Sequence, residues 1–209
     1  PPPEPQPQPT PQAGPTSTQP PEPQPLPPSG ESATLALKFE PGDSTTYKVV
    51  TEGKRSVTYE GSLAKDPALK GGETGDVVEM TFTQEIQSVN DRGYAAAKIT
   101  IRELKYTAEV KSETIIDFDS SRPEDQNNPL AKLTGQSYTI EIAPAGEVTQ
   151  VLDIKDAQAA AKGNPTAQRL IQTQAIKERH AVAGLPEPDN NKVSIGEDWS
   201  SIKTVGYGL

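Results

Sequence analysis

After residue 30, apolar residues occupy every second position along most of the chain, and this period of two constrains the fold more than any other feature. Leu35, Leu37 and Phe39 follow the pattern, and residues 41–43 (PGD) then supply turn chemistry. Successive side chains of a strand point to opposite faces, whereas a helix repeats every 3.6 residues. The alternation therefore predicts half-buried strands joined by turns.

A hairpin is predicted around residues 52–54 (EGK). Tyr47 and Val49 precede this segment at alternate positions, and Val57 and Tyr59 follow it in the same way. Glycine between two alternating runs favours a tight reversal of the chain. We expect two short strands here.

The clearest strand pair flanks a turn at residues 90–93 (NDRG). Before the turn, one face carries Val78, Met80, Phe82 and Ile86. After it, one face carries Ala95, Ala97, Ile99 and Ile101. The apolar positions then change from odd to even numbers, at Leu104, Tyr106, Ala108 and Val110. A β-bulge near Arg102 and Glu103 would keep both sets on the core side.

One helical region is predicted, from residue 153 to residue 183, in two pieces broken at Gly163. Asn164 is a good N-cap, and Pro165 suits the first helical position. The second piece has an apolar side, formed by Ala167, Leu170, Ile171, Ala175 and Ala181. This amphipathic pattern predicts a helix that packs on a sheet.

The predicted fold class is α+β, mostly antiparallel β. Further short strands at 115–118, 138–142 and 148–151 bring the expected number to eight or nine. Residues 31–209 would form a single domain, a strongly curved sheet or open barrel with one helical region packed on it. Large apolar side chains are few, so we expect part of the concave face to stay uncovered as an apolar groove. Its candidate lining residues are Met80, Phe82, Ile99, Ile101, Tyr138 and Ile140.

Residues 1–30 are predicted to be an extended linker. They hold 14 of the 22 prolines, and Ala13 and Leu26 are their only apolar residues besides proline. Proline fixes the backbone near polyproline II, and such a segment cannot bury a core. The sequence starts within this segment without Met, so we expect an exported chain whose signal has been removed, with any lipid anchor outside the given chain.

Composition argues against several classes of function. The net charge of −9 disfavours nucleic acid, which is bound by an excess of Lys and Arg. The sequence contains no Cys and one His, too few for a zinc site, and no apolar run long enough to span a membrane. Neither glycine pair, at 71–72 or 206–208, has the context of a phosphate-binding loop. We expect no enzyme activity and no cofactor.

Two groups of polar residues are candidates for a functional site. His180, the only histidine, follows Lys177, Glu178 and Arg179, where a cation would complement the dipole at a helix end. Asp117, Asp119, Glu124 and Asp125 offer the oxygen ligands that calcium takes. Their spacing does not match an EF-hand loop, which favours a solvated turn over a weak ion site.

Several segments resemble, in their order along the chain, a family of uncharacterised bacterial envelope proteins, many of them predicted lipoproteins. The resembling residues are 35–43 (LALKFEPGD) with Tyr47, 82–86 (FTQEI) with Gly93, 133–140 (LTGQSYTI), 144–148 (PAGEV), 185–186 (LP) and 196–199 (GEDW). The resemblance implies export, a β-rich domain and often an anchor before a flexible linker. It implies no activity.

Members of that family commonly continue with more strands after the element that resembles 196–199. The last strand predicted here, 200–207, would then be an open edge that accepts a strand from a partner. The candidate edge residues are Trp199, Ile202, Val205 and Tyr207.

Two functions therefore remain. The first is a non-enzymatic exported module of the bacterial envelope or surface that acts through contacts with other envelope proteins, as an assembly or structural subunit. The alternative is a periplasmic carrier that binds an apolar or lipid ligand on its curved sheet.

Overall fold

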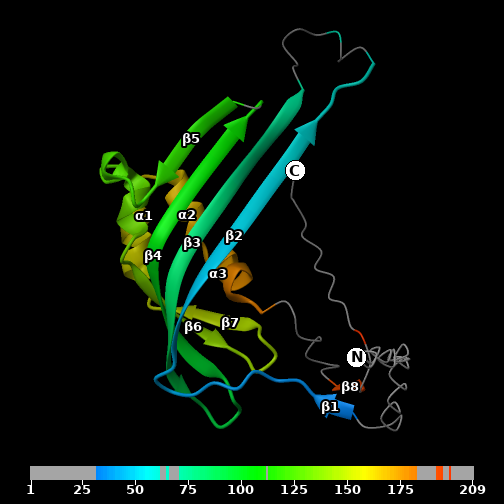
Figure 1. Ribbon diagram of the computed structural model, residues 1–209, viewed down its shortest axis with the longest axis vertical. Helices are drawn as coiled ribbons and strands as arrows, with labels where there is room; N and C mark the ends of the chain where they lie inside the picture. Colours follow the sequence, from blue (N-terminus) through cyan, green and yellow to red (C-terminus); the bar gives the residue numbers. More distant parts are fainter. Residues whose placement is uncertain are drawn as a thin grey trace, which may run out of the picture.

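The fold is α+β and mostly antiparallel β, as predicted (Figure 1). The computed structural model describes residues 32–61, 65, 71–111, 113–182, 192–194 and 198. Of these residues, 49% lie in strands and 21% in helices. None of the helices in this described part has the length and apolar character that a membrane crossing requires.

Six strands form the main sheet, and every pairing in it is antiparallel. They are β2 (Ser44–Val57), β3 (Gly72–Val89), β4 (Ala95–Val110), β5 (Glu113–Asp119), β6 (Ser137–Ile142) and β7 (Val148–Leu152). The order is β2-β3-β4-β6-β7, and β5 also pairs with β4. Strand β4 thus has β3 along one side and, in succession, β6 and β5 along the other. Two short strands, β1 (Ser32–Thr34) and β8 (Lys192–Ser194), pair separately.

The predicted β-bulge in β4 is confirmed. Glu103 pairs with Thr81 and Ile101 pairs with Phe82, so Arg102 is the extra residue. Ile101 and Leu104 are consequently both fully buried although they lie three positions apart. The bulge keeps the apolar set of each half of β4 on the same face.

The predicted hairpin at residues 52–54 is wrong, because β2 continues through this segment as one strand. Gly53 lies opposite Asp76, and β3 offers a partner to every residue from Ser44 to Val57. The long neighbouring strand therefore overrides the local turn preference of glycine.

The helical region contains three helices rather than two: α1 (Lys155–Ala161), α2 (Pro165–Leu170) and α3 (Thr173–His180). The predicted cap is confirmed, since the Asn164 side chain accepts a hydrogen bond from the Ala167 amide at 2.8 Å. The second break, at Ile171 and Gln172, was not predicted. It redirects the chain so that Ile176 in α3 is fully buried as well.

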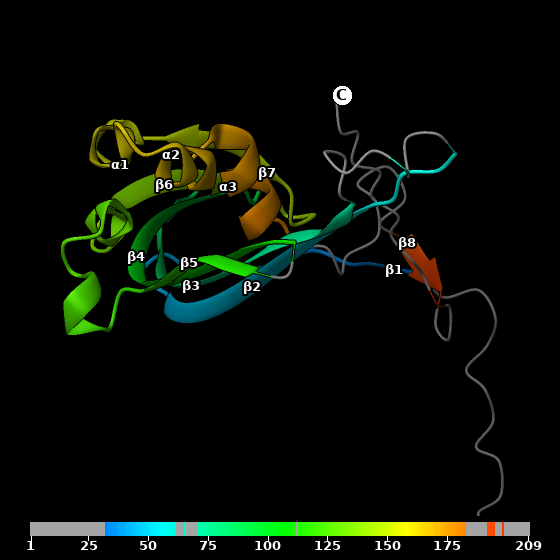
Figure 2. The same ribbon diagram turned by 90° about the horizontal axis from the view of Figure 1, so that it is seen from above.

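These helices lie over one face of the sheet, and the core fills the space between the two layers (Figure 2). The core includes Met80, Phe82, Leu104, Phe118, Tyr138, Leu170 and Ile176. The chain also has two 3-10 helices, η2 (Pro123–Asp125) and η3 (Pro129–Leu133). Only η3 contributes to the core, with Leu130 and Leu133.

Candidate functional site

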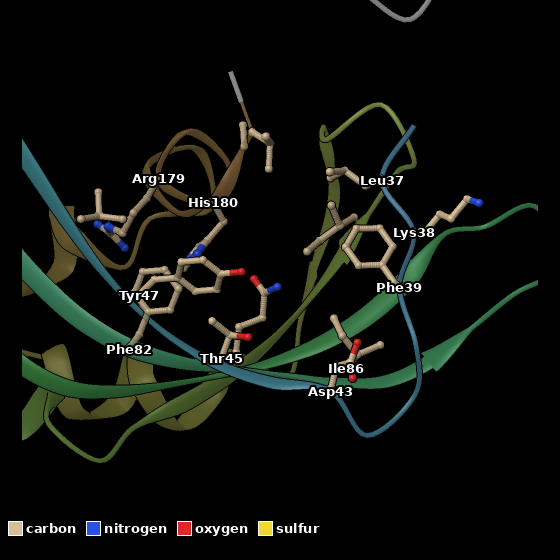
Figure 3. Close-up of a pocket in the computed structure, with 15 residues that line it drawn as sticks. Leu37, Lys38, Phe39, Asp43, Thr45, Tyr47, Phe82, Ile86, Arg179 and His180 are labelled. Carbon is tan, nitrogen blue, oxygen red and sulfur yellow. The ribbon is translucent and has the colours of Figure 1, made fainter. Parts of the chain in front are cut away.

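A pocket of about 390 Å³ opens where the segment before β2 passes the end of α3 (Figure 3). Strands β2 and β3 form its floor. Most of its lining is apolar: Leu37, Phe39, Tyr47, Val49, Phe82, Ile86, Ile142, Ala181 and Val182. The remaining lining residues are Lys38, Asp43, Thr45, Gln84, Arg179 and His180.

The alternation of β2 directs one set of side chains into the pocket. Thr45, Tyr47 and Val49 line it, whereas Val50 points to the other face and is 56% exposed. Tyr47 lies opposite Phe82 of β3, and their ring centroids are 5.8 Å apart. Cross-strand aromatic pairs of this kind stabilise antiparallel sheets.

Three backbone hydrogen bonds hold the segment before β2 against the sheet. The Leu37 amide donates to the Pro144 carbonyl at 2.7 Å. The Gly42 amide donates to the Ile86 carbonyl, and the Ile86 amide donates to the Asp43 carbonyl, both at 2.8 Å. Gly42 has a φ of +93°, a conformation that glycine adopts readily. The segment thus forms a fixed wall of the pocket.

His180 lies at the inner end of the pocket, buried among aromatic rings. Its Nε2 is 2.7 Å from the Tyr138 hydroxyl, and its ring packs edge-on to Phe82 at a centroid distance of 4.4 Å. Burial, together with the charge of Arg179, lowers the pKa of His180 to about 3. The prediction of a histidine cation at the helix end is therefore wrong, because the ring is neutral at pH 7.

The hydrogen-bond geometry assigns the tautomer of this neutral ring. The Tyr138 hydroxyl has no other acceptor among the described residues, so it donates to Nε2 of His180. The ring proton then sits on Nδ1, which is buried and has no hydrogen-bond partner in the described structure. Burial also raises the pKa of Tyr138, so its hydroxyl keeps its proton.

Arg179 lines the same end of the pocket and is half-buried. Its Nη2 donates to the Leu170 carbonyl at 2.8 Å, whereas its buried Nη1 has no partner. No carboxylate of the described residues pairs with it. By contrast, Arg122 and Arg169 each form ion pairs of 2.7–3.1 Å. The pocket therefore has a guanidinium that forms no ion pair with any described carboxylate.

The six predicted groove residues all belong to the buried core. Met80, Phe82, Ile99, Ile101, Tyr138 and Ile140 are each 3% exposed or less. The helices cover most of this face, and only Phe82 of the six also lines the pocket. The four predicted edge residues, Trp199, Ile202, Val205 and Tyr207, lie outside the described residues.

Three of the four candidate calcium ligands, Asp117, Asp119 and Asp125, pair with cations instead. Arg122 bridges Asp117 at 3.1 Å and Asp125 at 2.7 Å, and Lys105 pairs with Asp119 at 2.9 Å. Hydrogen bonds from Ser121, then from Lys105, hold the pKa of Asp119 well below its usual range. In the part of the chain that the structure describes, no three His, Cys, Asp or Glu side chains are arranged to hold a metal ion.

The pocket itself was not predicted from the sequence. The sequence places Tyr47 on a predicted strand and Arg179 beside His180 at a helix end, but no local pattern indicates that residues more than 130 positions apart line one pocket. One signal was present: an arginine beside the single histidine at the end of an apolar helix face.

No family model, curated protein or solved structure gives a significant match to this chain.

Proposed function

We propose that this protein is a non-enzymatic binding module that holds an apolar ligand in the pocket between β2, β3 and the end of α3. The observation that carries the proposal is the lining, in which nine apolar side chains meet a few polar groups at one end. The volume of about 390 Å³ lies within the range of roughly 300–1,000 Å³ typical of small-molecule sites.

The proposal places the protein in the bacterial cell envelope, after export. Supporting features are the proline-rich residues 1–30 and the resemblance of residues 34–200 to uncharacterised envelope proteins. The proposal also takes the sheet as strongly curved, close to an open barrel, with helices over its concave side. A carrier of this form would release its ligand to, or receive it from, other envelope proteins.

A neutral fluorescent probe tests the pocket directly. We expect N-phenyl-1-naphthylamine to bind the full chain with increased emission. Tyr47→Ser should weaken binding about five-fold or more, because the aromatic ring supplies much of one wall; burying an apolar side chain contributes roughly 1.5–3 kcal/mol.

Val50→Ser is the matched control. Val50 lies on the same strand and is also exposed, but it points away from the pocket. The proposal is wrong if the wild-type chain does not bind the probe. It is also wrong if Val50→Ser weakens binding as much as Tyr47→Ser does.

A second candidate function is an assembly subunit that acts through protein contacts, and strand β2 favours it. Among the described strands, β2 pairs only with β3. It is 14 residues long, and nearly all of its residues are exposed. A long strand with one open side is a template for strand addition by a partner.

A further inference from the structure

We infer that the ligand of this pocket is an amphiphile with one anionic head group, which binds beside Arg179 while its apolar part lies along Leu37, Phe39 and Ile86. The inference rests on the proposed function and adds the chemical class of the ligand. It draws on the placement of charges and of apolar surface along the pocket.

The first argument is the unbalanced charge of Arg179. Taking a charge partly out of water is costly unless an opposite charge compensates it. Arg179 lines the pocket, and no described carboxylate forms an ion pair with it. A ligand carboxylate or phosphate would supply the missing charge.

The second argument is that no negative charge competes at this end of the pocket. His180, which lines the pocket next to Arg179, is neutral at pH 7, because burial lowers its pKa to about 3. Its Nδ1–H is buried and does not face the pocket, so the head group would be recognised by the charge of Arg179.

The third argument is the arrangement of charge and apolar surface along the pocket. Arg179 and His180 lie at the end that holds Tyr47 and Phe82, whereas Leu37, Phe39 and Ile86 lie at the other end (Figure 3). Asp43 and Lys38, one negative and one positive lining residue, are also at that other end, where their charges offset each other. An anionic head is therefore attracted most to the Arg179 end, which orients the ligand.

Displacement of N-phenyl-1-naphthylamine at neutral pH tests the inference with two ligands of equal chain length, decanoate and decan-1-ol. We expect Arg179→Gln to raise the decanoate concentration needed for displacement about ten-fold or more, since a charge-assisted hydrogen bond contributes roughly 1.5–3 kcal/mol. The decan-1-ol concentration should change less than about two-fold, because the alcohol has no charge to pair.

Two further variants separate head-group recognition from a loss of structure. Lys98→Gln removes an exposed cation outside the pocket and should leave decanoate displacement unchanged. Arg179→Lys keeps the charge and should retain most of the affinity for decanoate. Equal loss of decanoate and decan-1-ol in Arg179→Gln would show a structural role for Arg179 and would overturn the inference.

Other outcomes are equally decisive. If decanoate displaces the probe equally well from the wild-type chain and from Arg179→Gln, the inference fails while the apolar pocket stands. If neither the probe nor decan-1-ol binds the wild-type chain, the proposed function itself fails. If acetate alone competes as well as decanoate does, the site binds simple anions, and the assignment to an amphiphile is wrong.

Discussion

His180 packs between Phe82 and Tyr138, and a proton added to its ring would be buried with it. No described carboxylate forms an ion pair with His180 that would balance this proton. The charged group that acts on the ring, Arg179, has the same sign as the proton. Protonation is therefore much less favourable in the folded chain than in the unfolded chain. One side chain thus links the stability of the pocket wall to pH.

The sign of this effect follows from the two pKa values of His180, about 3 in the folded state and 6.5 in the unfolded state. Between these values the unfolded chain binds a proton that the folded chain does not. The contribution of His180 to the free energy of unfolding is therefore fully present above about pH 6.5 and decreases as the pH falls toward 3. We expect the free energy of unfolding to decrease by roughly 2–3 kcal/mol between pH 7 and pH 4.5, measured by urea denaturation.

His180→Gln is the control for this prediction. Glutamine keeps a polar group near the Tyr138 hydroxyl and does not titrate. Most carboxylates protonate below pH 4.5, so the variant should lose much less stability over the same interval. Equal losses in the wild-type chain and the variant would show that His180 is not the group responsible.

For single residues, the sequence predicts the features that depend on neighbouring residues along the chain. The cap at Asn164 followed from Asn-Pro at a helix start, and the structure confirms it. The neutral state of His180 did not follow, because its burial depends on Phe82 and Tyr138, which are 98 and 42 positions away in the sequence. Charge states of buried groups require the tertiary contacts.

One extra residue in strand β4 determines which of its side chains point into the core. Arg102 interrupts the pairing with β3, so Ile101 and Leu104 both point into the core. Removing Arg102 would restore strict alternation, with Glu103 outward between two inward residues. Removing Thr100 would instead turn Ile99, Ala97 and Ala95 toward the solvent.

A pair of single-residue deletions tests this account. We expect the chain without Arg102 to keep a single cooperative thermal transition, because its core residues keep their faces. The chain without Thr100 should lose that transition, since fully buried Ile99 alone would forfeit roughly 1.5–3 kcal/mol of burial. Circular dichroism during heating measures both. The account is wrong if the two deletions behave alike.

Strand patterns were readable from the sequence wherever one face of a strand is buried and the other is not. This was so for β3 and β4, including the bulge. It was not so for β2, whose residues are exposed on both faces over most of its length, so that Gly53 appeared to mark a turn. The break after α2 was also missed, because Ile171 continues the apolar pattern of the helix.

Among the described strands of the molecule, β2 has a neighbour on one side only, and the same strand lines the pocket. The outward face of β2 carries Val50, and the inward face carries Tyr47 and Val49. An assembly role and a ligand-binding role would therefore use different faces of one strand. This arrangement allows the two candidate functions to be tested separately.

Val50→Lys tests the assembly role. A lysine on an edge strand disfavours pairing with another strand. If β2 recruits a partner, sedimentation should show association of the wild-type chain with itself or with an envelope component, and Val50→Lys should weaken that association. Val110→Lys, at an exposed position on β4, should have no effect. A wild-type chain that is monomeric and associates with no envelope component would contradict the assembly role.

The class of the fold was within reach of the sequence, because alternation and turn residues act locally. The arrangement of the three helices over the sheet, and hence the pocket at its edge, was not. That arrangement depends on how far the helices extend across the sheet face, which short patterns do not encode. Recognition of a function from sequence was limited in the same way, since the residues that form the pocket come from four separate parts of the chain.

The turn between β3 and β4 has a consequence for the order in which the chain folds. Asn90 closes it through its side chain, which accepts hydrogen bonds from the Arg92 and Tyr94 amides at 2.9 and 3.0 Å. Joining two long strands through so short a loop costs little conformational entropy, whereas β6 can reach β4 only after a much longer loop has closed. We therefore expect the β3–β4 hairpin to form before β6 pairs with β4, and the pocket, which needs β2 and α3 in place, to form after that hairpin.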